Sequence, residues 1–282
     1  MKNQTTLVVL TTETSDNDLV ALLEDARAMD ARVLLLILSQ APTYPVNAYG
    51  HLPYGSLDVP TEWIEQVNTS KALLKERTEA VKTLLQKAEI PGEVHAIQCV
   101  PFDAREIVAR RAMVCDIATI VGPVRETNPA MFHAAAHGIL FEAPIGLCLN
   151  ASPLAQPEHI FIAWNTELPA SRAVHAALPM IKGASQITIG CVDHKATELT
   201  DGEDPGTQVA QWLSHHGADV TVNQYTSGGH DVGAVIRRRA QELGADLIVM
   251  GAYGHTRLRE VVFGGVTRSM LDDTELPVFL AH

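Results

Sequence analysis

The sequence of 282 residues is poor in basic residues, in aromatic residues and in long apolar runs. Lysine and arginine number 21 against 33 aspartate and glutamate residues, which gives a formal net charge of -12. Because DNA and RNA binding needs a basic surface, this balance argues against nucleic acid as the main partner, although backbone amides could still hold a single nucleotide. No run approaches the ~18 apolar residues of a membrane span, and the apolar run at residues 7–10 is too short for a signal peptide. We therefore expect a cytoplasmic protein with no membrane partner.

Cysteine is also sparse, and no CxxC pair occurs. The four cysteines are scattered along the chain: Cys99, Cys115, Cys148 and Cys191. They lie in or beside apolar stretches, so we interpret them as reduced, buried thiols rather than as disulfides or a metal cluster. Hydrophobic residues make up 46% of the sequence, which is enough for a sizeable core and, at this length, for two domains.

The chain contains two copies of one unit. Short apolar runs at residues 7–10 and 160–163 are each followed by a polar turn and an amphipathic helix pattern, and alternating strand and helix patterns continue to the end of each half. The strands are too apolar to have a wet face, which predicts an α/β fold with parallel sheets covered by helices on both faces. We place the domains at residues 1–150 and 151–282, joined by a linker rich in proline and small residues.

The first half carries an insertion at residues 39–60 that the second half lacks. It is rich in proline and contains Tyr44, Tyr49 and Tyr54, so it is either a surface loop packed by its own aromatics or a lid or partner-docking loop. An apolar stripe with spacings of 4 or 7 then predicts one long helix over residues 61–88.

A glycine framework near the carboxy terminus is the most informative motif. Its spacing is Gly251-x2-Gly254-x9-Gly264-Gly265-x-Thr267. Gly251 ends an apolar strand, where open α/β sheets place their ligands, and residues without a Cβ allow main chain to approach a phosphate closely. Gly264 and Gly265 precede an apolar helix whose first amides are unpaired and suit an anion. Helix caps and tight turns also use glycine, so the spacing alone leaves both interpretations open.

The whole string MGAYGHTRLRE…FGGVTR, set between GADLIV and LPVFL, resembles the universal stress protein family, whose pattern is G-x2-G-x9-G-[ST]. The resemblance covers the chain as two tandem domains and is strongest over residues 231–282. It implies two Rossmann-like (HUP-type) domains, each with a five-stranded parallel sheet. It also implies that ATP or AMP, with or without Mg²⁺, is the cofactor, because one branch of the family binds adenine nucleotides.

Carried over position by position, the resemblance implies one nucleotide site in the second domain. Ala163 would lie against the adenine, main chain near Val192 would hydrogen-bond it, and Asn165 stands where an aspartate is usual. His255 faces either the phosphate or solvent. The phosphate and ribose contacts would come from the glycine motif: Gly251, Gly254, Gly264, Gly265, Val266 and Thr267.

Departures from the family pattern predict how the two halves differ. Gly265 replaces a serine or threonine and Asn165 replaces an acid, so we expect weaker Mg²⁺ dependence and weaker hydrolysis. In the first half Arg125 takes the place of the second glycine, and residues 128–133 contain no glycine pair. We therefore expect that the first domain has lost the nucleotide site and serves as a structural or regulatory partner.

Other polar clusters favour structural roles. His133 and His137 share a helix face, but no third metal ligand is evident. The histidines at 215–216 suit a helix end. The arginines at 237–239 are balanced by nearby Glu242 and Asp246 and are interpreted as a solvated helix face.

Two functions remain open. The first is a stress-response protein that binds an adenine nucleotide and acts through its conformation or an unknown protein partner, with no dedicated catalytic activity. The alternative is a slow ATPase or a phosphoryl- or adenylyl-transfer enzyme. In the family the last strand often makes the dimer contact, so the halves could form a pseudo-dimer within one chain, and a homodimer of chains is a further possibility.

Overall fold

The computed structural model describes residues 3–44, 59–194, 204–252 and 265–282. The first half of the chain contains five strands and five helices in these ranges, namely β1 (Thr5–Thr11), α1 (Asp16–Ala28), β2 (Arg32–Gln40), α2 (Thr61–Ala88), β3 (Gly92–Cys99), α3 (Pro101–Ala112), β4 (Ile117–Ile120), α4 (Val124–Thr127), α5 (Pro129–Glu142) and β5 (Gly146–Leu149). The second half repeats this order, with β6 (His159–Ala163), α6 (Leu168–Ala176), α7 (Leu178–Ile181), β7 (Gln186–Val192), α8 (Thr207–His215), β8 (Val220–Tyr225), α9 (Val232–Glu242), β9 (Leu247–Gly251), α10 (Gly265–Asp272) and β10 (Val278–Ala281). The predicted alternation of strands and helices in both halves is confirmed.

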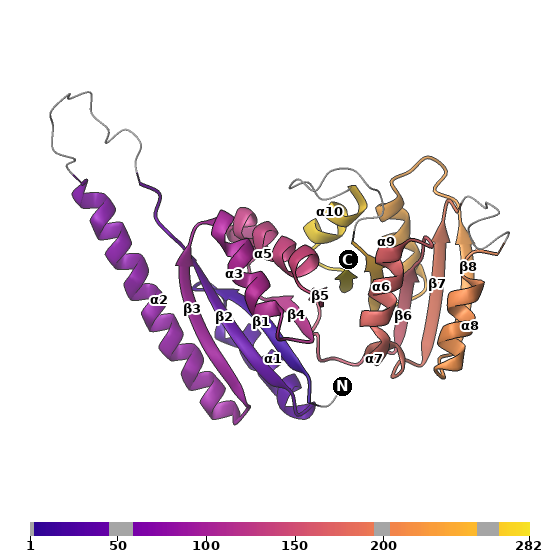
Figure 1. Ribbon diagram of the computed structural model, residues 1–282, viewed down its shortest axis with the longest axis horizontal. Coiled ribbons are helices and arrows are strands. Elements are labelled where there is room, and N and C mark those ends of the chain that lie inside the picture. The colour runs from indigo at the N-terminus through magenta and orange to yellow at the C-terminus, as the bar shows by residue number, and fades with distance from the viewer. Residues whose placement is uncertain (1–2, 45–58, 195–203, 253–264) are drawn as a thin grey trace.

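All of the described strands belong to one sheet, in the order β3-β2-β1-β4-β5-β10-β9-β6-β7-β8. Strands are parallel within each half, and the halves join where β5 and β10 pair antiparallel, with Phe279 opposite Cys148. Figure 1 shows the two half-sheets side by side, with helices on both faces of each. The last strands thus meet within one chain, as a pseudo-dimer requires.

The hydrophobic cores differ between the two faces of the sheet. On one face a single cluster runs across both halves, from Val108 of α3 and Ile139 of α5 to Ile236 of α9 and Met270 of α10. On the other face α1 and α2 cover the first half, and α6, α7 and α8 cover the second, each with a separate cluster. The two halves therefore share extensive apolar burial on one face, and on the other face Ile117 and Cys148 of the first half join the second-half cluster. This shared burial contributes to their association.

The long helix α2 coincides with the predicted range and lies along the edge strand β3 (Figure 1). Leu74, Val81 and Leu85 are buried, whereas Trp63 and Val67, toward the amino-terminal end, are only partly buried. The Trp63 indole donates to the carbonyl oxygen of Pro42 at 3.2 Å. The predicted apolar stripe therefore packs fully only in the second part of the helix.

The prediction that no strand has a wet face is wrong for the two outermost strands. β3 and β8 consist mostly of partly buried residues with a few exposed ones, Glu93 in β3 and Thr221 and Gln224 in β8, because each strand pairs with a neighbour on one side only. The eight strands between them carry the long buried runs, such as residues 33–39 of β2.

The four cysteines are buried and free, as predicted. Burial raises the pKa of Cys99 and of Cys115 to about 11 and that of Cys148 to about 12. A thiol with a pKa of 11 is ionised to roughly one part in a thousand at pH 8, so native protein should react with iodoacetamide at least ~100-fold more slowly than a free cysteine. Mass spectrometry of alkylation with and without urea checks this, and rapid labelling of folded protein would contradict it.

Candidate functional site

The candidate site lies at the carboxyl ends of β6 and β9 in the second half. The strand order reverses between these two neighbours, since β7 and β8 extend from β6 on one side and β10 follows β9 on the other. Ala163 at the end of β6 is in register with Met250, which directly precedes Gly251. Open α/β sheets bind their ligands at such a reversal point, so Ala163 and Gly251 lie where the sequence predicts the site.

The loop after β6 is a tight turn that carries Asn165. The Trp164 amide donates to the carbonyl oxygen of Gly190 at 3.0 Å, and Thr166 has a left-handed backbone with φ of 63°. Asn165 is exposed, and its Oδ1 accepts a hydrogen bond from the Glu167 amide at 3.2 Å. The carboxamide oxygen of Asn165 therefore orients the turn into α6.

The end of β7 is tied to the end of β8. Val192 is partly buried, and the next residue, Asp193, has a φ of 50°. The Asp193 amide donates to the Tyr225 carbonyl oxygen at 3.0 Å, and its Oδ1 accepts from the Ser227 amide at 2.8 Å. This fixes the main chain beside Val192. The sequence analysis did not single out Asp193, although a polar residue directly after an apolar strand is a recognisable signal.

Gly251 has a packing role that the sequence analysis did not foresee. A Cβ on Gly251 would lie 2.5 Å from the amide nitrogen of Ala170 and 2.5 Å from the carbonyl carbon of Pro169. The close main-chain approach at this glycine is thus made by the first turn of α6. A phosphate contact at Gly251 stays a prediction.

Gly265 is the first described residue of α10. Among the described residues, no heavy atom would lie within 4 Å of a Cβ built on Gly265, and the φ of Gly265 is not in the left-handed region. Val266 is partly buried, and Thr267 is only 2% exposed, so the Thr267 hydroxyl faces the protein interior. Gly254, His255 and Gly264 lie outside the described residues.

At the reversal point of the first half, between β1 and β4, the Thr14 side chain lies beside Gly122. Thr14 is 2% exposed, its hydroxyl donates to the Val121 carbonyl oxygen at 3.2 Å, and it accepts from the Thr11 amide at 3.0 Å. Gly122 has a φ of 79°, and a Cβ there would lie 2.9 Å from the Thr14 hydroxyl. Thr14 therefore occupies the place directly beside Gly122, while a pocket of about 460 Å³ lies next to it, lined by Gly122, Arg125 and Asn150 among others. The loss of a nucleotide site in the first half stays a prediction.

Arg125, which replaces the family's second glycine, bonds to the second half. Its guanidinium donates to the carbonyl oxygen of Asp273 and, at 3.3 Å, to Oδ1 of Asn150. It also lies 4.7 Å above the ring centre of Phe132. Burial lowers the pKa of Arg125, but an arginine remains cationic at neutral pH.

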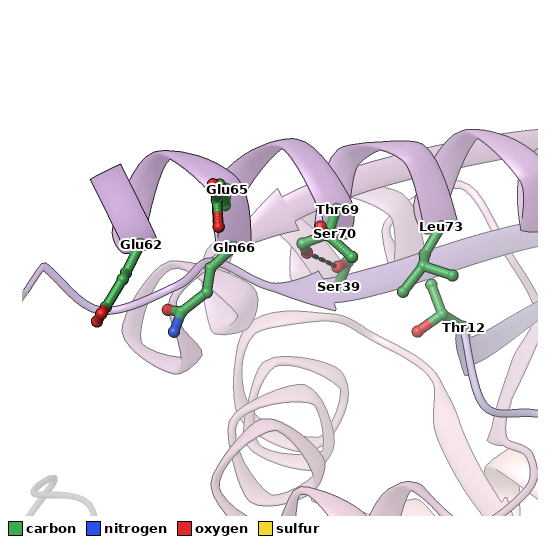
Figure 2. Close-up of a pocket in the computed structure, with 8 residues that line it drawn as sticks. All are labelled: Thr12, Ser39, Glu62, Glu65, Gln66, Thr69, Ser70 and Leu73. Atoms are coloured by element: carbon green, nitrogen blue, oxygen red, sulfur yellow. Dashed lines mark hydrogen bonds between the residues drawn. The ribbon is translucent and has the colours of Figure 1, made fainter. Parts of the chain in front are cut away.

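A pocket of about 530 Å³ lies between the amino-terminal part of α2 and the carboxyl ends of β1 and β2. Figure 2 shows hydroxyl groups from both sides, including the Ser39–Ser70 hydrogen bond of 3.3 Å, together with the carboxylates of Glu62 and Glu65. Two carboxylates disfavour a phosphate nearby. Phosphate binding is therefore disfavoured in this pocket.

The two histidines of α5 each lie near an acidic side chain. His133 lies 3.5 Å from Asp272, and His137 lies 3.9 Å from Glu142; burial lowers the pKa of both histidines. No group of three metal-ligating side chains occurs within the parts of the chain that the structure describes.

The prediction of a solvated arginine face is wrong for Arg237. Its guanidinium donates to the Ser269 carbonyl oxygen at 3.1 Å and hydroxyl at 2.7 Å, and it lies 3.7 Å from the Asp273 carboxylate. Asp246 does not balance these arginines, because its carboxylate accepts hydrogen bonds from the Glu158 and His159 amides, both at 2.9 Å.

The fold and the place of the candidate site define the class of protein: a doubly wound, Rossmann-like α/β protein with its candidate site at a strand-order reversal. Residues 172–282 match the model of the Universal stress protein family, so the second half carries a domain of that family. This assignment supports a role in the stress response.

Solved structures share the fold over the whole chain. A universal stress protein from Archaeoglobus fulgidus DSM 4304 has a TM-score of 0.63 at 16% identity, and covers 98% of this chain and 97% of its own. A functionally unknown protein from Pseudomonas aeruginosa PAO1 has a TM-score of 0.52 at 14% identity, and covers 99% and 92%. At these identities the likeness shows the fold alone. No curated protein matches the sequence significantly.

Within the described parts of the chain, no helix is long and apolar enough to cross a membrane.

Proposed function

We propose that the protein binds an adenine nucleotide, ATP or AMP, at the carboxyl ends of β6 and β9, and that the bound nucleotide alters its conformation or its contacts with a protein partner. The observation that carries the proposal is the glycine at the first described residue of α10, where a Cβ would meet no heavy atom of the described residues within 4 Å. Gly265 leaves the first amides of this helix uncovered by its own side chain, and such amides favour an anion. The family match includes the entire glycine motif, Gly254, His255 and Gly264 among its residues.

The proposal is one of binding without dedicated turnover. Asn165 stands at the position where a carboxylate is usual, and a carboxamide cannot accept a proton as a general base. Its oxygen already accepts a hydrogen bond from Glu167. Slow hydrolysis by another group would appear as steady phosphate release from ATP.

Substituting Gly265 tests the proposal with two matched variants of the full chain. Gly265→Ser adds a Cβ in open space together with a hydroxyl, whereas Gly265→Ala adds the Cβ alone. A hydrogen bond to a charged acceptor contributes about 1.5–3 kcal/mol, so we expect the serine variant to bind ATP at least roughly tenfold more tightly than the alanine variant.

Isothermal titration calorimetry with ATP, ADP and AMP measures these affinities. Gly265→Asp, which brings a carboxylate against the phosphates, should bind most weakly of all the variants. The proposal is wrong if the wild-type protein binds none of the three nucleotides at millimolar concentration, or if all four proteins bind with the same affinity.

A further inference from the structure

The segment between α10 and β10 is held by residues of the first half. The side-chain amide nitrogen Nδ2 of Asn150 donates to the carbonyl oxygens of Asp273, at 2.9 Å, and Leu276, at 2.8 Å. The Arg125 guanidinium donates to the same Asp273 carbonyl oxygen, and it also bonds to Asn150 Oδ1. We call Arg125 and Asn150 the clamp. These two residues hydrogen-bond to each other and, across the boundary between the halves, to the segment that follows α10.

The clamp is preorganised by the first half itself. Asn150 has a left-handed backbone with φ of 59°, which directs its side chain immediately after β5 ends. The Arg125 guanidinium lies over the Phe132 ring of α5, and a cation above an aromatic ring is stabilised there. Both groups therefore hold their orientation before they meet the second half.

The clamp contacts the carboxy-terminal end of α10, opposite the proposed phosphate site. Asp273 directly follows the last residue of α10, and Arg237 of α9 holds the same turn through Ser269 and the Asp273 carboxylate. Cations near the final carbonyl groups of a helix stabilise the helix, because the negative end of its dipole lies there. The eight residues of α10 span about 12 Å, so one rigid helix connects the clamp to Gly265.

We propose that Arg125 and Asn150 are positioning residues that set the nucleotide affinity of the second half by fixing α10. This inference rests on the proposed function, since it concerns the same site. Phosphate binding requires helix amides held within about 0.5 Å of their productive positions. If the clamp contacts at the carboxy-terminal end of α10 are removed, the amides at its amino-terminal end should be held less precisely. Because coupling between two sites acts in both directions, a bound nucleotide should in turn stabilise the clamp contacts.

The test compares four variants of the full chain, of which one, Arg125→Lys, tests for rescue. Arg125→Ala removes the guanidinium, and Asn150→Gly removes the amide while tolerating the left-handed backbone. Arg110→Ala is the matched control, since it removes an exposed arginine of the first half whose partner is Glu106 on the same helix. Thermal unfolding followed by circular dichroism establishes that each variant is folded at the temperature of measurement.

Two readouts decide the outcome. Hydrogen exchange without nucleotide should be faster over residues 266–276 in both clamp variants and unchanged in the control, and the ATP dissociation constant should rise at least roughly fivefold, at the lower end of typical couplings between sites. Arg125→Lys, which keeps one cationic donor, should recover part of the loss.

Each failure has its own signature. If wild-type protein binds ATP and the clamp variants bind it equally well, the inference is overturned while the proposed function stands. If wild-type protein binds no nucleotide, the proposed function and the coupling fail together. Unchanged exchange over residues 266–276 in both clamp variants contradicts the positioning role directly.

Discussion

Gly251→Ala is expected to destabilise the protein by about 2–4 kcal/mol, because the new Cβ would lie 2.5 Å from backbone atoms of Pro169 and Ala170. Backbone at the start of a helix cannot rotate aside as a side chain can, so α6 would have to shift away from β9. Urea unfolding monitored by circular dichroism gives the change in free energy.

Gly265→Ala is the control for this prediction, since the same methyl group there meets open space. Its stability should stay within about 1 kcal/mol of wild type, with a slight gain because alanine favours helix over glycine. Equal stability of the two alanine variants would contradict the packing role of Gly251. The comparison also separates stability from ligand binding within one glycine motif.

Phe279→Ala should reduce the free energy of unfolding by about 3–5 kcal/mol, the range typical of a buried phenylalanine. Phe279 is 1% exposed, lies in β10 at the junction of the halves, and covers the place where a Cβ on Gly146 of β5 would be. Its loss leaves a cavity between two strands that have only four residues each.

Phe102→Ala provides the comparison, because the Phe102 side chain belongs to the same residue type and is 83% exposed. We expect its effect to stay within about 0.5 kcal/mol. Similar urea midpoints for both variants would show that the ring of Phe279 contributes little to the junction of the halves.

Local patterns predicted the elements of this fold well. Apolar runs and helix periodicity gave the repeated order of strands and helices, and Asp231 caps α9 as its position before the helix suggests, accepting from the Ala234 amide at 2.8 Å. The outermost strands were predicted less well, because a strand's exposure depends on how many neighbours it has. Sequence composition alone does not specify those neighbours.

The strand ends of the candidate site could be predicted from the sequence, but the packing around them could not. The strand ends at Ala163, Val192 and Gly251 lie near the reversal point, since the carboxyl edge of a parallel sheet gathers them. The partner of Arg125 lies 148 residues away in sequence, and no local pattern indicates such a contact. The position of the Thr14 side chain beside Gly122 was equally hidden, because it depends on a hydrogen bond to Val121.

The junction between β5 and β10 explains why both copies of the unit belong in one polypeptide. Phe279 and Gly146 occupy corresponding places in the two repeats, in the stretches LPVFLA and APIGLC, yet they touch each other. In a symmetric assembly of identical copies, every residue at such a place would meet an identical residue. A ring would then collide with a ring, or a glycine would leave a void beside a glycine. When both copies belong to one chain, the two positions can mutate independently. One copy can then carry the large side chain of Phe279 and the other the glycine, Gly146, that makes room for it.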